Sequence, residues 1–271
     1  RSTLFPYTTL FRSPYRYNEA RVVEVHRDGR VSDIARLPEA TTGVAGNAVG
    51  IEAGADGWLY VAYRQRSALD ANELTDSRHI ACRDAAVTRT GVYRVHPDRR
   101  DVEPVATRAQ GWPVCFPNDL AIDSQGDLYV SDFYLGGIWR LRSGQTPQLW
   151  SDDVLLGWAP APWALAPAGV NAIALNPKGD ALLAGTVGNP MILQLSLRNG
   201  QTAGPPEILQ RDGGPTDGMA VASDGTIFTS EILRSEIWAL SPDGRERHLV
   251  ANRRTAPIWR SEERRVGKEC R

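Results

Sequence analysis

The sequence predicts an all-β fold, a β-propeller built from four-stranded blades, and three observations support this prediction. Four segments of equal length superimpose without gaps, and each reads as two apolar strands joined by a polar turn. A third short apolar strand follows every one of these hairpins. The repeats begin at 49, 118, 171 and 217, and steps approaching about 45–50 residues are typical of propeller blades.

The hairpins form the inner half of each predicted blade. Short β-rich runs joined by Asp-Gly, Gln-Gly or Lys-Gly turns are typical of β-hairpins. Each turn carries a glycine, at Gly57, Gly126, Gly179 or Gly225. The four segments are VGIEAGADGWLYVAY (49–63), NDLAIDSQGDLYVSD (118–132), NAIALNPKGDALLAG (171–185) and DGMAVASDGTIFTSE (217–231).

The outer half of each blade follows from the third strands and the turns after them. A fifth copy of the third strand, VVEV (22–25), has no matching hairpin before it. The longer step between the first two repeats is explained by a polar insertion at about residues 64–90. The third strands are VYRV (92–95), IWRL (138–141), ILQL (192–195) and IWAL (237–240), and turn signals that precede a fourth strand follow them.

The two ends of the chain are antisense copies of each other. Codons for Thr3 to Ser13 can be chosen so that their reverse complement encodes Arg260 to Cys270. This string resembles a sequencing adapter read in both directions, so we interpret residues 1–13 and 260–271 as adapter-derived and exclude them from the fold. We therefore expect residues 14–259 to be an internal fragment with about four complete blades and part of a fifth.

Composition restricts the partners. The formal net charge is −1 and no basic stripe is present, which argues against nucleic acid. No apolar run is long enough for a membrane helix. We expect a monomer that acts on a small molecule. Cys82 and Cys115 either form a disulfide, which favours a periplasmic or secreted protein, or are two unrelated thiols.

Three phrases resemble the senescence marker protein/gluconolactonase/regucalcin family. They are FPNDLAID followed by GDLYVSD, GVNAIALNPKGD, and PTDGMAVASDGTIF, and the resemblance spans most of residues 14–259. It implies a six-bladed propeller that holds one divalent metal, usually calcium, in the central channel. Magnesium, manganese and zinc are the alternatives. Many members hydrolyse lactones or related esters at that metal.

The same resemblance implies the metal ligands. The family takes them from the start of the innermost strands, and the matching positions here are Asn118, Asn171 and Asp217, with Val49 contributing none. Amide and carboxylate oxygens are hard donors that suit calcium or magnesium, which supports this assignment independently. Asp217 and Asn118 are also the expected catalytic residues. The family's Glu ligand is expected upstream of Pro14, so the printed chain is expected to bind metal weakly.

The expected activity is metal-dependent hydrolysis of a lactone or related ester, with the metal as a Lewis acid that activates water. The alternatives are a non-catalytic ligand-binding propeller and a lyase or synthase similar to strictosidine synthase. Phe116 replaces an arginine of the aldonolactone-specific members, which leaves the substrate open. Asp119 is either a turn residue or a partner that orients a ligand, and Asp132 and Glu231 are expected to face the channel mouth or solvent.

Overall fold

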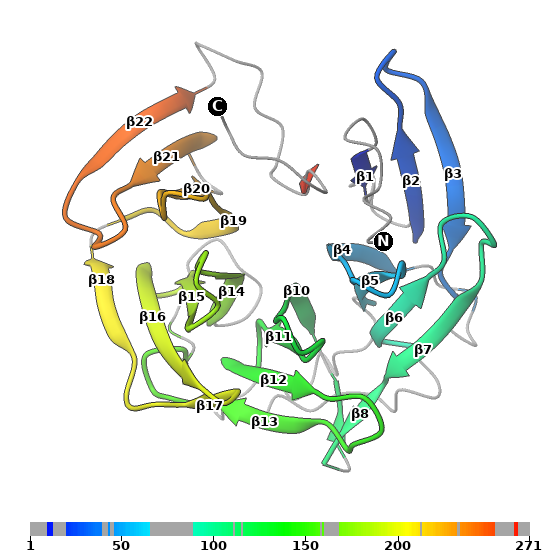
Figure 1. The fold of residues 1–271 in the computed structure, drawn as a ribbon, viewed down its shortest axis with the longest axis horizontal. Coiled ribbons are helices and arrows are strands. Elements are labelled where there is room, and N and C mark those ends of the chain that lie inside the picture. Colours follow the sequence, from blue (N-terminus) through cyan, green and yellow to red (C-terminus); the bar gives the residue numbers. More distant parts are fainter. Residues whose placement is uncertain are drawn as a thin grey trace.

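The structure is a computed structural model in which every regular element is a β-strand within the described residues. These residues are 10–12, 20–39, 43, 46–65, 89–110, 112–114, 116–157, 159, 168–211, 213–231, 234–252 and 263–264. Four antiparallel sheets follow one another around a common centre as the blades of a propeller (Figure 1). The prediction of an all-β propeller with four-stranded blades is confirmed.

Each blade runs from the centre to the rim in chain order. The first contains β4 (Asn47–Ala53), β5 (Leu59–Arg64), β6 (Gly91–Val95) and β7 (Val102–Ala106). The second contains β10 (Pro117–Ile122), β11 (Leu128–Asp132), β12 (Gly137–Leu141) and β13 (Gln148–Ser151). The third contains β14 (Val170–Leu175), β15 (Ala181–Thr186), β16 (Met191–Arg198), β17 (Gln201–Thr202) and β18 (Glu207–Arg211). The fourth contains β19 (Thr216–Val221), β20 (Ile227–Glu231), β21 (Glu236–Leu240) and β22 (Arg247–Asn252).

A further sheet is formed by strands from both ends of the chain. It has the order β23-β1-β2-β3, formed by β1 (Leu10–Arg12), β2 (Arg21–Val25), β3 (Val31–Arg36) and β23 (Glu263–Arg264). The fifth copy of the third strand is β2, which pairs with β3 on its outer side as expected. On its inner side it pairs with β1, from a segment that we excluded from the fold. A separate two-stranded sheet joins β8 (Arg108–Ala109) and β9 (Trp112–Pro113).

The hairpin turns match the sequence pattern, with one difference in register. The four turn glycines have φ values between 70° and 89°, the left-handed region that glycine adopts without strain. In three hairpins the gap-free alignment of the repeats holds. In the third repeat the turn is one residue longer, because Val170 pairs with Thr186, whereas Pro117 pairs with Asp132 in the second. Thr186, and not Gly185, therefore matches Asp132 and Glu231.

The apolar core lies between consecutive blades. Alternate residues of one strand face opposite neighbours, so Leu128 and Val130 of β11 pack towards the first blade and Tyr129 packs towards the third. This arrangement explains why strands at the centre are apolar on both faces. Tyr93 and Trp139, which share one repeat position with Trp238, lie in these inter-blade clusters, and Trp238 packs against one.

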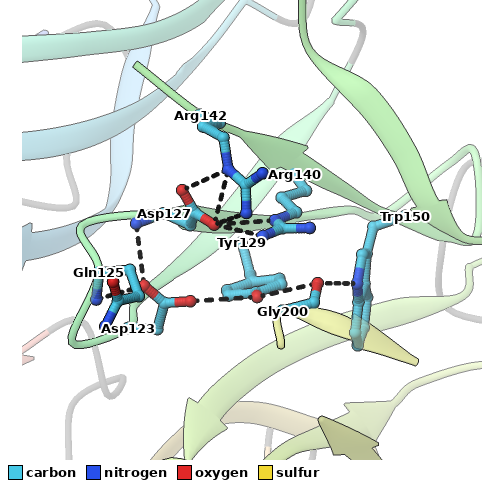
Figure 2. Close-up of polar contacts among 8 residues, drawn as sticks. All are labelled: Asp123, Gln125, Asp127, Tyr129, Arg140, Arg142, Trp150 and Gly200. Carbon is cyan, nitrogen blue, oxygen red and sulfur yellow. Dashed lines mark hydrogen bonds and ion pairs between the residues drawn. The ribbon is translucent and has the colours of Figure 1, made fainter. Parts of the chain in front are cut away.

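A polar network joins the second and third blades towards the rim (Figure 2). Asp127 accepts hydrogen bonds from Arg140 and Arg142, with Arg142 Nη2 2.9 Å from Asp127 Oδ2. The backbone oxygen of Gly200, in the next blade, accepts a hydrogen bond of 3.0 Å from Trp150 Nε1. Tyr129 packs edge-on against the Trp150 ring, with the ring centroids 5.0 Å apart. The network therefore anchors the rim of one blade to the turn of the next.

Candidate functional site

The innermost strand of every blade carries a β-bulge at the predicted ligand position. In β10, Pro117 pairs with Asp132 and Leu120 with Val130, so Asn118 and Asp119 together face one residue of β11. The same shift in register occurs in β4 at 49–50, in β14 at 171–172 and in β19 at 217. A bulge redirects a side chain out of the regular alternation of a strand. These positions are therefore distinguished from the rest of the strand in backbone geometry as well as in sequence.

Two of the three predicted ligands meet at the centre of the propeller. Asn118 donates a hydrogen bond from Nδ2 to Oδ1 of Asn171, and both residues are buried. Asp217 occupies the corresponding bulge on β19, which packs beside β14, and it is partly exposed. In Figure 1 the inner strands β10, β14 and β19 surround the same central region. The structure thus brings Asn118 and Asn171 into contact and places Asp217 on the adjacent inner strand.

Asp119 and Ser131 hold these inner strands together. The two Asp119 carboxylate oxygens accept the backbone N–H of Leu120, at 2.9 Å, and that of Ile173 in the next blade, at 3.0 Å. Ser131 accepts the backbone N–H of Asp119 at 2.9 Å and donates to the backbone oxygen of Asn171 at 2.5 Å. Of the two roles considered for Asp119, the contacts favour an orienting partner, because they fix the backbone on both sides of the Asn118–Asn171 pair.

Gly50 allows β4 to approach β10 at the same level. A Cβ atom at Gly50 would lie 2.7 Å from the backbone oxygen of Asn118 and 2.8 Å from Asp119 Cα. Both are backbone atoms, which cannot move aside as a flexible side chain does. We expect Gly50→Ala to lower the free energy of unfolding by about 1–3 kcal/mol, the usual cost of overpacking, in a denaturant titration.

Gly213→Ala is the matched control for this substitution. A Cβ atom there would meet only the end of the Gln210 side chain, at 3.5 Å. Its stability should stay within about 0.5 kcal/mol of the parent chain. Equal stabilities of the two variants would show that the contact between β4 and β10 is looser than described.

Arg64 is a candidate site residue that the sequence did not reveal. It ends β5, and its Nη1 donates a hydrogen bond to Oδ1 of Asn118 in the next blade. Its guanidinium lies 4.4 Å from the centroid of the Phe116 ring. Phe116 in turn packs against Tyr134 and Phe133, with ring centroids 4.3 Å and 6.0 Å away. The only sequence signal was position, since Arg64 directly follows the second strand of its hairpin, where we placed the start of the insertion.

The expectation that Asp132 and Glu231 face the channel mouth or solvent is wrong. They are 1% and 4% exposed, because each carboxylate turns inward to accept backbone N–H groups. Asp132 accepts the N–H of Leu135 at 3.1 Å, and Glu231 accepts that of Gly214 at 2.8 Å. Burial raises the pKa of Asp132, and the groups that donate hydrogen bonds to this carboxylate, such as the N–H of Leu135, oppose the rise. Both residues organise loops next to the inner strands.

Three further points concern the two cysteines, clusters of metal-binding side chains, and membrane-spanning helices. Cys82 and Cys115 both lie outside the described residues, so their pairing stays a prediction. Within the described ranges, no three His, Cys, Asp or Glu side chains gather in a way that could hold a metal. Nor does this part of the chain contain a helix that could cross a membrane.

Residues 21–265 match the family described as the SMP-30/gluconolactonase/LRE-like region. The chain belongs to this family. The match covers the propeller blades and all three predicted ligand positions. Among proteins with curated functions, none is similar enough in sequence to count as a relative.

Solved structures share the fold at low sequence identity. A gluconolactonase from Xanthomonas campestris has a TM-score of 0.61 and 16% identity, over 91% of this chain and 78% of that one. A putative gluconolactonase has a TM-score of 0.56 and 19% identity, over 93% and 81%. Virginiamycin B lyase from Staphylococcus aureus has a TM-score of 0.55 and 12% identity, over 89% and 69%. At these identities the likeness concerns the fold alone.

Proposed function

We propose that this member of the SMP-30/gluconolactonase/LRE-like family is a metal-dependent hydrolase of a lactone or related ester. The observation that carries the proposal is the contact between Asn118 and Asn171 at equivalent bulges of adjacent inner strands. Buried amides at the centre of a propeller are costly unless they have polar partners. Family membership supports the lactonase-like activity, and the chemistry of the side chains supports the metal.

The side chains present fit a hard divalent cation. Asn118, Asn171 and Asp217 would hold it through two amide oxygens and one carboxylate, a donor set that calcium accepts together with water or substrate. In the structure both amide oxygens already accept hydrogen bonds, from Arg64 and from Asn118 itself, and a cation would take over these acceptors. With only one charged group in the set, we expect weak affinity, with a Kd of about 0.1–1 mM.

Each residue of the proposed site has its own role in hydrolysis. A bound divalent ion supplies Lewis-acid polarisation of the ester carbonyl and lowers the pKa of water. Asp217, the only carboxylate among the three, would accept the proton of the attacking water. Asn118 orients the substrate oxygen through its amide. Asp119 and Ser131 keep the two asparagines aligned by fixing the strands that carry them.

Calcium titration and lactone hydrolysis together test this function. The chain, dialysed against EDTA, is titrated with CaCl₂ in a calorimeter, and proton release from a panel of lactones is followed in a pH-stat. We expect saturable calcium binding and hydrolysis that falls at least about tenfold on chelation, because the ion stabilises the developing charge. Hydrolysis that is unaffected by EDTA would refute the metal mechanism.

Mass analysis of the product separates the alternatives. A hydrolysed substrate gains the mass of one water, whereas an eliminated substrate keeps its total mass in the products. A product of the second kind would favour a lyase. Ligand binding with no turnover at any calcium concentration would favour a binding propeller.

A further inference from the structure

Arg64 differs from the other arginines that stack on aromatic rings. Five guanidiniums lie over rings in the described part of the chain. Four of them also pair with a carboxylate: Arg94 with Glu103, Arg99 with Asp101, Arg140 with Asp127 and Arg247 with Glu231. Arg64 has no ion pair with any described carboxylate, and its hydrogen-bond partner Asn118 is neutral.

The position of this charge makes it relevant to the site. Arg64 belongs to the first blade, while Asn118 and Phe116 belong to the second, so its guanidinium crosses from one blade to the next at the centre. Stacking on Phe116, which is itself packed on Tyr134, restricts the guanidinium to one orientation. Phe116 and Asn118 therefore order the side chain without a carboxylate from the described residues, which is how a preformed anion-binding group is arranged.

The chemistry of guanidinium defines the ligand. It has five N–H donors, and the bond to Asn118 uses one of them. A carboxylate can accept two of the remaining donors side by side, and this bidentate pairing is the contact for which arginine is favoured over lysine. Phe116 supplies an apolar wall beside the same donors, which suits the carbon skeleton of a small molecule.

We infer that Arg64 is a specificity-determining residue that binds the carboxylate of a hydroxy acid seated against Asn118. The inference rests on the proposed function in one respect, since hydrolysis of a lactone yields a hydroxy acid. The carboxylate takes the guanidinium donors of Arg64, and the hydroxyl groups lie towards the amides of Asn118 and Asn171. A neutral polyol of the same length lacks the group that Arg64 recognises.

Gluconate and sorbitol are matched probes, because they differ in a carboxylate against a hydroxymethyl group on the same carbon chain. Binding of each to the full chain is measured by calorimetry in EDTA, so that no metal contributes. We expect gluconate to bind more tightly than sorbitol, and Arg64→Ala to weaken gluconate about ten- to hundredfold, the loss expected for hydrogen bonds to a charged group. Sorbitol binding should not change.

Arg94→Ala is the control variant. Arg94 also lies over an aromatic ring, Trp58, but it pairs with Glu103 on the neighbouring strand of its own blade. Its loss should leave gluconate binding unchanged. Arg64→Lys should bind gluconate more tightly than Arg64→Ala but less tightly than the parent chain. Lysine keeps the positive charge but lacks the planar pair of N–H donors that binds both carboxylate oxygens. If Arg64→Ala fails to fold, Arg64→Gln, which keeps a donor for Asn118, gives the same comparison.

The outcomes separate this inference from the proposed function. Equal affinity for gluconate and sorbitol, no binding of either, or full gluconate binding by a folded Arg64→Ala or Arg64→Gln variant would overturn the role of Arg64. Arg64-dependent gluconate binding in a chain that binds no calcium would support the inference and refute the metal-dependent function. Calcium-dependent turnover without any dependence on Arg64 would support the metal-dependent function and overturn the inference about Arg64.

Discussion

Replacing Asp127 by alanine is expected to lower the free energy of unfolding by about 3–5 kcal/mol, the cost of breaking a buried ion pair by removing one partner. The side chains of Asp127 and Arg140 are only 5% and 4% exposed, and the carboxylate accepts two donors from that guanidinium (Figure 2). Without Asp127, a charged guanidinium stays buried beside Tyr129. Denaturant titration at neutral pH measures the loss.

Arg142→Ala provides the comparison within the same network. Arg142 also pairs with Asp127, but its side chain is 42% exposed and solvent screens the interaction. We expect a change within about 1 kcal/mol. If both substitutions cost equally little, the buried pair does not stabilise the second blade as described.

The contribution of Asp127 should also disappear in acid. Burial raises the pKa of this carboxyl, but the hydrogen bonds from Arg142 and Arg140 outweigh burial and hold the pKa below its ordinary value. A depressed folded-state pKa stabilises the protein above the unfolded-state pKa of about 3.9, and the stabilisation is lost as the pH falls through the folded-state pKa. The difference in unfolding free energy between the parent chain and Asp127→Ala should therefore shrink as the pH falls below about 4. A constant difference across this range would contradict the assignment.

Asp217→Ala is expected to weaken calcium binding at least about a hundredfold, because the number of charged ligands sets calcium affinity over several orders of magnitude. Asp217 is the only carboxylate in the proposed ligand set, and the two asparagines alone leave the charge of the cation uncompensated. Calorimetric titration with calcium measures the effect, and hydrolysis of any lactone substrate should be lost in parallel.

Two variants identify the reason for such a loss. Asp217→Asn keeps an oxygen donor and removes the charge, so its affinity should lie between those of the parent chain and Asp217→Ala. Asp224→Ala removes an exposed carboxylate from the turn of the same blade, where it accepts the N–H of Thr226, and should leave calcium binding unchanged. Parent-like calcium affinity in Asp217→Ala would exclude this residue from the site.

The blade architecture could be predicted from the sequence because its determinants are local. Each hairpin needs a glycine at a positive φ, as at Gly126, and strands whose alternate residues pack on different neighbours. The ligand positions could be proposed because every repeat places the same strand at the centre. The register of the third repeat was predicted one residue out, since pairing of Val170 with Thr186 depends on a longer turn that the spacing does not reveal.

Tertiary structure alone decided what surrounds those positions. The bridge from Asp119 to Ile173 depends on a contact between strands of different blades. The bulges and the inward turn of Asp132 and Glu231 form nearer in the chain, but the repeat pattern did not reveal them either. Arg64 and Asn118 are 54 positions apart, and only the packing of one blade against the next brings them together. The sequence by itself determined which strands form and which strand of each blade is innermost. The contacts that those strands make depend on inter-blade geometry. A repeat pattern specifies each blade separately, and it does not show which residues of the next blade a given side chain contacts.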